Sequence, residues 1–261
     1  MHEIVTKEYC IVEKSEHVLT VRLNRPERLN ALHSLAHLEL AEVFDDYESD
    51  DNMWVAIITG EGRGFCAGND LRYQAEGGVR HATPKGFAGV TSRWNMTKPI
   101  IAAVNGVAMG GGFEIAMSAD FIVAAEHAQF FLPETRVGVL PDAGSIRLPR
   151  LMPRQLANEI IFGGRRLTAD EAMSWGIVNK VAPVAELMNT ARALASEICL
   201  SAPLSIAAVL DIIRVTEDLS VADSYAAMRK NEAYMKAINS EDAMEGPNAF
   251  AEKRDPVWKG K

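Results

Sequence analysis

Two glutamates stand in otherwise apolar stretches of the chain, twenty residues apart. Glu114 is the only charged residue in the run NGVAMGGGFEIAMSA (residues 105–119), and Glu134 follows a proline in FFLPETRVG. A carboxylate that leaves water without a partner is strongly destabilised or shifts its pKa, so a buried one usually has a use. The pattern indicates a pair of groups that could exchange protons with a bound molecule.

Each glutamate also has a purely structural explanation. Glu114 lies near the start of an expected helix, whose dipole would stabilise it, and Glu134 could pair with Arg136 or Arg147. The expected helix that begins near Gly111 would carry the chain roughly 12 Å away if it has about 8 residues. A following strand of about 5 residues covers roughly 17 Å, which is enough to bring the chain back. The spacing therefore permits the two carboxylates to share one pocket.

Glycines mark two further positions where a backbone could approach a ligand. Three successive glycines, Gly110 to Gly112, open the expected helix, where unpaired N–H groups and the dipole favour an oxyanion. A second glycine turn, FCAGNDL (65–71), follows the expected strand 55–60 and could supply another donor. A tight turn with positive φ and an ordinary strand-to-helix turn are the structural alternatives.

Other familiar motifs are incomplete. HSLAH (33–37) places two histidines one helical turn apart but lacks the glutamate of a zinc peptidase, so we expect a solvated helix face. The glycine run has neither GxGxxG spacing nor a following GK with Ser or Thr, and DAGSI around Ser145 is not GxSxG. Dinucleotide, P-loop and serine-hydrolase sites are therefore not predicted.

The hydrophobic patterns predict an α/β core followed by helices. Apolar or alternating runs predict strands at 17–24, 55–60, 99–106, 120–125 and 128–132, and helices at 35–50 and from 111. Asn30 or Ser34 could cap the first helix. Beyond 183 the pattern is almost wholly helical, so we expect a core domain with the active site at 1–195 and a helical segment at 196–261.

Composition narrows the partners and the compartment. The chain has 261 residues, a net charge of −8 and a pI near 5.3. It lacks the clusters of Lys and Arg that bind nucleic acid or an anionic membrane. Three cysteines without CxxC spacing favour a reducing compartment, and the N-terminus lacks the apolar core of a signal peptide. We expect a cytoplasmic protein with no nucleic-acid or membrane partner.

Four ordered motifs together resemble the enoyl-CoA hydratase/isomerase, or crotonase, superfamily over almost the whole chain. They are FCAGNDL, KPIIAAVNGVAMGGGFEIAMSADFIVAA, FFLPETRVGVLPDAG and GRRLTADEAMSWGIVNKV. The resemblance implies a crotonase-like spiral of ββα units, with C-terminal helices that build homotrimers, usually paired into hexamers. It also implies an acyl thioester of coenzyme A as substrate and no metal or separate cofactor.

The same resemblance assigns roles to particular residues. Glu114 and Glu134 match the two catalytic glutamates of the hydratases, whereas the isomerases generally lack the first. Gly111 and Asn69 match the positions whose N–H groups form the oxyanion hole, although many hydratases have alanine at the Asn69 position. The coenzyme A moiety would contact the four residues that begin there, Asn69, Asp70, Leu71 and Arg72.

These roles match the chemistry inferred from the residues. Adding water to an enoyl thioester places negative charge on the thioester oxygen, which two N–H donors would stabilise. Glu114 would hold and deprotonate the water, while Glu134 would exchange a proton with the α-carbon. Asp142, eight residues after Glu134, could attract a trimethylammonium group on the acyl chain, or could simply be a turn or cap residue. Isomerisation, acyl-CoA hydrolysis, and a non-catalytic module that binds coenzyme A or nucleic acid remain the alternatives.

Overall fold

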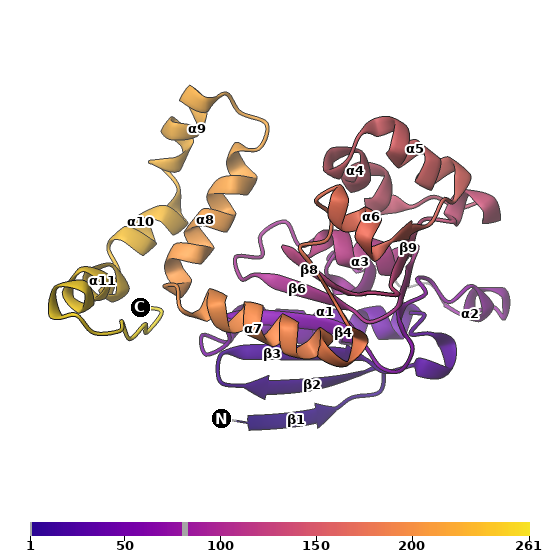
Figure 1. Ribbon diagram of the computed structural model, residues 1–261, viewed down its shortest axis with the longest axis horizontal. Coiled ribbons are helices and arrows are strands. Elements are labelled where there is room, and N and C mark those ends of the chain that lie inside the picture. Colours follow the sequence, from indigo (N-terminus) through magenta and orange to yellow (C-terminus); the bar gives the residue numbers. More distant parts are fainter. Residues whose placement is uncertain (1, 80–82) are drawn as a thin grey trace.

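The computed structural model describes residues 2–79 and 83–261 and contains two β-sheets, covering helices and a helical C-terminal extension (Figure 1). The strands β4 (Val55–Gly60) and β6 (Ile100–Val104) are buried at every position. Their continuous apolar sequences explain this, because parallel strands covered on both faces have no solvent side. Both strands were predicted from the sequence.

The larger sheet has seven strands in the order β1-β2-β3-β4-β6-β8-β11. The first three pair antiparallel, and every pairing from β3 to β11 is parallel. The remaining bounds are β1 His2–Thr6, β2 Cys10–Ser15, β3 Val18–Leu23, β8 Phe121–Ala125 and β11 Lys180–Ala182.

The smaller sheet has four strands in the order β10-β9-β7-β5, and β5, β7 and β9 run parallel. Their bounds are β5 Gly64–Cys66, β7 Val107–Met109, β9 Gln129–Phe131 and β10 Leu167–Thr168. The chain alternates between the sheets, because β4 is followed by β5, β6 by β7 and β8 by β9, with a helix after each pair. This repeated strand–strand–helix winding confirms the crotonase-like spiral, and it brings the loops after β5, β7 and β9 to one edge.

Helix α1 (Ser34–Ser49) begins differently from the prediction. His33 caps it by accepting from the Ala36 N–H at 3.5 Å, whereas Asn30 is buried and donates to the carbonyls of Glu61 and Gly64. His33 is 7% exposed and His37 is half-buried, so the expected solvated histidine face was wrong. Neighbouring chain segments cover this side of the helix, which a single-helix pattern cannot reveal.

The other helices of the core connect or cover the sheets. They are α2 Leu71–Ala75, α3 Gly111–Ser118, α4 Asp142–Leu151, α5 Arg154–Gly163, α6 Ala169–Ser174 and α7 Leu187–Cys199. Helix α7 buries Leu187, Ala191, Leu194 and Ala195 in one hydrophobic cluster with residues of β4, β6 and β8. The predicted boundary between 195 and 196 therefore falls inside a helix that packs on the core.

Residues 203–261 form a C-terminal arm that extends away from the sheets (Figure 1). Its helices are α8 Pro203–Thr216, α9 Val221–Met228, α10 Glu232–Ile238 and α11 Glu241–Glu252. The arm buries only Ala208, Ala237, Asp242 and Ala249. Many large apolar side chains are exposed instead, among them Val209, Ile213, Val215, Val221, Tyr225, Met244 and Phe250.

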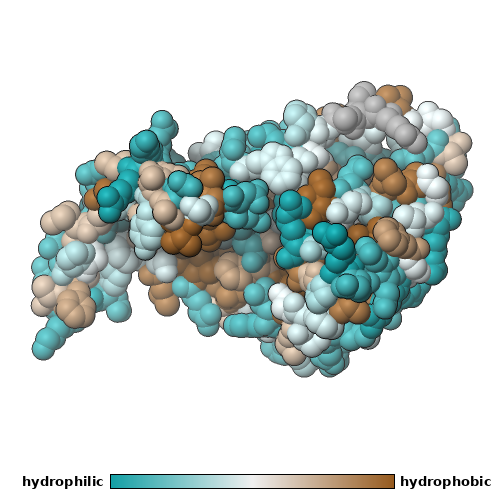
Figure 2. Space-filling model, turned by 90° about the horizontal axis from the view of Figure 1, so that it is seen from above, coloured by the Kyte–Doolittle hydropathy of each residue, from teal (hydrophilic) through white to brown (hydrophobic). Residues whose placement is uncertain are grey.

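Figure 2 shows hydrophobic residues gathered in the hollow between the arm and the core. No single helix in the described part of the chain is long and apolar enough to cross a bilayer. Among the described residues, one pair of helical segments has the length and composition to span a bilayer together. This pair, Val184–Cys199 and Pro203–Thr216, is bent by 99°.

Candidate active site

The loops after β5, β7 and β9 meet around the N-terminus of α3. A Cβ atom on Gly68, in the first loop, would lie 2.8 Å from the Met109 carbonyl oxygen and 3.0 Å from the Gly111 nitrogen. The Gly110 N–H donates to the Phe131 carbonyl at 2.9 Å, which joins the second loop to the third strand. Three segments that are distant in sequence thus build one small site.

Two backbone donors are placed together by this arrangement. Gly111 is the first residue of α3, so its N–H has no carbonyl of a preceding turn to bond. Gly68 accepts from the Leu32 N–H and Asp70 donates to the Leu32 carbonyl, both at 2.8 Å. Because backbone groups alternate along an extended segment, the N–H of the intervening Asn69 points away from Leu32. The arrangement allows Asn69 and Gly111 to donate to one oxygen.

The three glycines of this site also have packing reasons. Gly110 has a φ of +56°, and a Cβ on it would collide with the Glu134 carboxylate. A Cβ on Gly111 would approach the Phe87 ring, and one on Gly112 would collide with the Cys66 carbonyl. Each of the three positions therefore requires glycine, because other atoms of the protein approach each one closely. A single tight turn would explain only one of the three glycines.

Glu114 lies on the inner face of α3 and is 5% exposed. Its Oε1 accepts from the Gly144 N–H at 2.8 Å. Burial raises the pKa of Glu114 to about 7, and the negative charges of Glu134 and Asp142 add to the rise while the Gly144 N–H opposes it. The group can therefore exchange a proton near neutral pH.

Glu134 opens the 3-10 turn Glu134–Val137 after β9, with its carboxylate against Gly110. Its Oε2 is buried and accepts no hydrogen bond from any described residue. Burial raises the pKa of Glu134, and the nearby Asp142 charge raises it further. Arg136 instead donates to the Gly163 carbonyl, and Arg147 lies over the Trp94 ring, so neither alternative ion pair forms in this structure.

The two carboxylates and Asp142 share one cleft of about 400 Å³. Its lining also includes Asn69, Leu71, Gly110 and Gly111. The structure therefore brings together six of the eight site residues predicted from sequence, namely Glu114, Glu134, Gly111, Asn69, Leu71 and Asp142.

The other two predicted residues have different surroundings. Asp70 caps α2, accepting from the Tyr73 N–H at 3.1 Å and from Arg25 at 3.0 Å. Arg72 pairs with Glu76 at 2.9 Å, and both side chains are exposed. Neither side chain lines the cleft among the described residues. Their contact with coenzyme A stays a prediction.

A second cavity of about 410 Å³ adjoins the cleft at Glu114, Phe87 and Asp142. It extends along Ser92, Trp94, Ile146, Arg147 and Arg150. The lining mixes aromatic side chains with charged groups.

Sequence reasoning missed Phe87 and Trp94. Phe87 lies in GFAG between two glycines, and that local signal marks an irregular backbone without indicating where the ring points. Trp94 is 60% exposed and has no helical or strand periodicity around it. Only tertiary structure shows that both residues line a cavity that Glu114 also lines.

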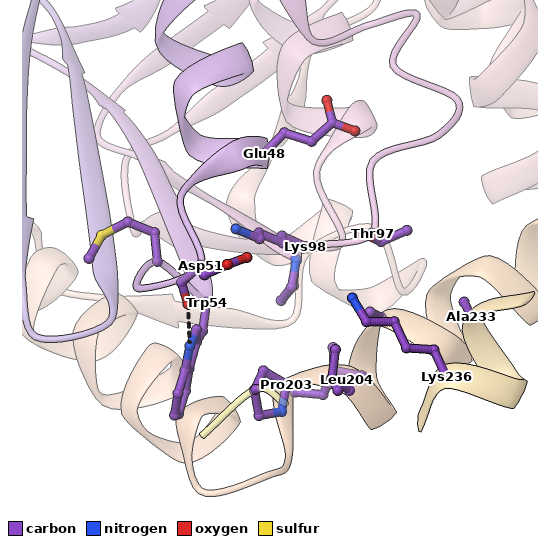
Figure 3. Close-up of a pocket in the computed structure, with 14 residues that line it drawn as sticks. Glu48, Asp51, Trp54, Thr97, Lys98, Pro203, Leu204, Ala233 and Lys236 are labelled. Atoms are coloured by element: carbon purple, nitrogen blue, oxygen red, sulfur yellow. Dashed lines mark hydrogen bonds between the residues drawn. The ribbon is translucent and has the colours of Figure 1, made fainter. Parts of the chain in front are cut away.

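Another cavity, between the end of α1, the loop before β6 and the arm, contains neither Glu114 nor Glu134 (Figure 3). Lys98 and Lys236 both line it, but the Lys98 ammonium already donates to the carbonyls of Tyr47 and Asp50 at 2.9 and 2.7 Å. The cavity therefore lies where the arm meets the core. Within residues 2–79 and 83–261, no three His, Cys, Asp or Glu side chains are grouped to hold a metal ion.

The spiral fold and the carboxylate pair beside two backbone donors define an enzyme of the crotonase class. The chain belongs to the enoyl-CoA hydratase/isomerase family, whose sequence model matches residues 13–261. It is similar to carnitinyl-CoA dehydratase of Escherichia coli O157:H7, with 50% identity over 250 residues that cover 94% of this chain and 95% of the relative. The Salmonella paratyphi A carnitinyl-CoA dehydratase is 48% identical over the same shares of both chains.

Solved structures support the same fold. The enoyl-CoA hydratase from Mycobacterium tuberculosis H37Rv superposes with a TM-score of 0.92 at 37% identity, covering 98% of this chain and all of that one. The enoyl-CoA hydratase from Bacillus anthracis superposes with a TM-score of 0.88 at 34% identity, covering 97% of this chain and all of that one. The C-terminal helical region is included in these alignments.

Proposed function

We propose that this protein catalyses the reversible hydration and dehydration of an enoyl-CoA thioester. The observation that carries the proposal is the pair of a buried Glu114 and a half-buried Glu134, whose pKa values are both raised, beside the first N–H of α3. Groups that titrate near the working pH make efficient general acids and bases. Coenzyme A is part of the substrate, and the proposal requires no separate cofactor.

The proposed reaction divides into two proton transfers around one enolate. Glu114 accepts a proton from water as the water oxygen bonds to the β-carbon, and the electron pair of the double bond moves toward the thioester carbonyl. The N–H groups of Gly111 and Asn69 stabilise the resulting oxyanion. Glu134 then gives a proton to the α-carbon, and the reverse sequence dehydrates a 3-hydroxyacyl thioester.

The hydrogen bonding of each carboxylate supports these separate roles. The Gly144 N–H donates to Oε1 of Glu114 and holds the carboxylate in place to orient a water molecule. The buried Oε2 of Glu134 accepts no hydrogen bond from the described protein, so it can exchange a proton with a substrate carbon. One carboxylate is held for water and the other faces the acyl chain.

The direct test is a panel of enoyl-CoA and 3-hydroxyacyl-CoA thioesters incubated with the enzyme in H₂¹⁸O and analysed by mass spectrometry. We expect addition of one labelled water to the enoyl substrates and loss of water from the hydroxyacyl substrates. A shifted double bond without a mass change would favour isomerisation, and release of free coenzyme A would favour hydrolysis. Binding of thioesters without any product would indicate a non-catalytic module.

Within this reaction class, we propose carnitinyl-CoA and crotonobetainyl-CoA as the substrate pair. The names of the bacterial relatives at 48–50% identity support it. So do GGFE, LPRLMP and the C-terminal ending, which resemble the same branch of the family. Asp142 lies where the cleft meets the second cavity, so its carboxylate could attract a trimethylammonium group.

Asp142→Asn tests this substrate assignment. We expect kcat/KM for crotonobetainyl-CoA to fall about tenfold, because one partly screened charge contact is on the order of 1 kcal/mol or somewhat more. Crotonyl-CoA, which has no charge on its acyl chain, should change less than threefold. Glutaconyl-CoA carries a carboxylate at the same end and could instead use Arg147 or Arg150. A preference for glutaconyl-CoA, or equal losses for all three thioesters, would contradict the assignment.

We also propose that the chain forms homotrimers, or hexamers built from them, through the C-terminal arm. The exposed apolar side chains of α8, α9 and α11 support this, because a monomer would leave them in water. The division into a core at 1–195 and a helical segment at 196–261 stays a prediction. The cytoplasmic location also stays a prediction, in keeping with the free thiols of Cys10, Cys66 and Cys199.

A further inference from the structure

The loop at residues 86–89 has an unusual backbone and contacts helices α1 and α3. Gly86, Ala88 and Gly89 all have positive φ values, of 76°, 53° and 67°. Ala88 is the exceptional member, because L residues other than glycine, asparagine and aspartate rarely adopt the left-handed region. Such a conformation persists only where surrounding contacts hold it.

Two of the contacts that hold the loop come from outside its own turn. The Arg93 side chain, buried at 2% exposure, donates to the Gly89 and Ala41 carbonyls at 2.5 and 2.6 Å. The Ala88 N–H donates to Nδ1 of His37 on α1 at 3.1 Å. Arg93 therefore holds the carbonyl of the residue after Ala88, and His37 holds the N–H of Ala88 itself.

His37 performs this role as a neutral imidazole. A ring nitrogen that accepts a hydrogen bond carries no proton, so the proton of His37 must lie on Nε2. Burial, with a further contribution from His33, lowers the pKa of His37 to about 4. The imidazole therefore remains an acceptor throughout the neutral range.

The consequence of this contact reaches the active site through Phe87. The Phe87 ring lies 4.4 Å from the His37 ring, centroid to centroid, at an angle of 59°. The same ring is so close to Gly111 that a Cβ there would lie 2.6 Å from the Phe87 Cε1 atom. Phe87 lines both the cleft that contains Glu114 and Glu134 and the second cavity beside it. A shift of this loop would move a wall of both spaces.

We propose that His37 is a positioning residue for catalysis, which holds Ala88 in its left-handed conformation so that Phe87 stays against Gly111. The role explains the histidine of HSLAH for which the sequence offered no chemistry. His37 itself lines neither cavity among the described residues, so its effect must pass through the loop. The kinetic part of this proposal rests on the proposed enoyl-CoA reaction, whereas the structural part does not.

The test compares His37→Leu with His37→Asn. The two replacements have nearly the same shape, but only asparagine offers an acceptor close to the position of Nδ1. His17→Leu is the matched control, because His17 stacks on Trp54 at a centroid distance of 3.7 Å and lines neither active-site cavity. Circular dichroism and thermal melting select the variants that fold.

Amide hydrogen exchange of the peptide spanning residues 84–92 gives a readout that needs no substrate. We expect exchange about tenfold faster than in the parent for His37→Leu, and within twofold of the parent for His37→Asn and His17→Leu. Ala88→Gly in the His37→Leu background should slow exchange again, because glycine adopts a φ of 53° without the Cβ penalty. Unchanged exchange in a folded His37→Leu variant would overturn the structural part.

Kinetics test whether the held loop matters for the reaction. For His37→Leu we expect kcat with the best enoyl-CoA to fall about tenfold, while inhibition by free coenzyme A, which has no acyl group, stays within twofold. His37→Asn should recover most of kcat. Equal weakening of turnover and coenzyme A inhibition, or equal losses in both His37 variants, would contradict positioning. If no thioester reacts even with the parent, the proposed function fails while the exchange result still decides the role of His37.

Discussion

The core around α3 and the C-terminal arm differ sharply in how much they bury. Helix α3 buries seven of its eight residues, including the charged Glu114. The arm buries four residues between 203 and 261 and leaves large apolar groups such as Phe250, at 88%, in contact with solvent. A single chain therefore completes the packing around its proposed catalytic pair but not the packing of its last four helices.

This difference separates two tasks within the chain. Loops after three neighbouring parallel strands fix the glutamates and the backbone donors, so the proposed chemistry needs no contact with the arm. The arm instead exposes apolar surface, through which we propose that other copies of the chain bind. A substitution in the core site should therefore leave oligomer formation almost unchanged, and a substitution on the arm should leave the chemistry at the core site almost unchanged.

The largest expected effect comes from removing an oxyanion donor. Gly111→Pro deletes the N–H at a first helical position where proline is tolerated, but its ring would meet Phe87. The informative comparison is therefore Gly111→Pro with Phe87→Ala against Phe87→Ala alone. Loss of one donor costs about 2.7–4 kcal/mol, so kcat should fall roughly 10²–10³-fold. Near-equal turnover of the two folded proteins would reject the donor role of Gly111.

A charge on the apolar face of the arm should have the next largest effect. Ile213 on α8 is 58% exposed, and we expect Ile213→Glu to raise the concentration at which oligomers dissociate about ten- to a hundredfold, because burying an unpaired charge is unfavourable. Sedimentation velocity measures the species present. Ile213→Leu is the control that keeps the apolar surface, and an unchanged distribution for Ile213→Glu would exclude this face from the interface.

The smallest effect concerns stability and pH, through Glu114. The folded pKa of Glu114, about 7, exceeds the ordinary glutamate value of 4.5. The native state therefore binds the proton more tightly than the unfolded chain and loses stability as the pH rises between these values. Glu114→Gln keeps an acceptor for the Gly144 N–H without the charge. At pH 8 we expect its free energy of unfolding to be about 1–3 kcal/mol higher than that of the parent. Urea denaturation at pH 8 and pH 5 measures this. The difference should fall to about a quarter of its pH 8 value at pH 5, and a constant difference would contradict the shifted pKa.

The sequence predicted those parts of the fold that have strong local patterns. The runs at 55–60 and 99–106 became buried parallel strands, and the glycines at 110–112 open α3. By contrast, β10 has two residues and β5 has three, which is too short for any periodicity to identify. Such strands exist because neighbouring segments pair with them, and that information is tertiary.

The site shows the same division. The positions of Glu114 and Glu134 in apolar stretches permitted a shared pocket, and the family resemblance gave them paired roles and pointed to Asp142. The structure places all three residues along one cleft. The role of Phe87 depends on a left-handed Ala88 and on a histidine fifty residues earlier in the chain, which no local pattern joins. The histidine face was misjudged for that reason, because the loop that covers it is distant in sequence.

The central claim, that Glu114 and Glu134 act together on one water and one proton path, is tested most directly by kcat of Glu114→Gln, Glu134→Gln and the double variant. We expect each single change to lower kcat at least 10²-fold on the thioester that the parent hydrates, with the oligomer intact. The double variant should lose far less than the product of the two single losses, because either change already disables the shared path. Multiplicative losses, or a folded single variant within a few fold of the parent, would contradict the account.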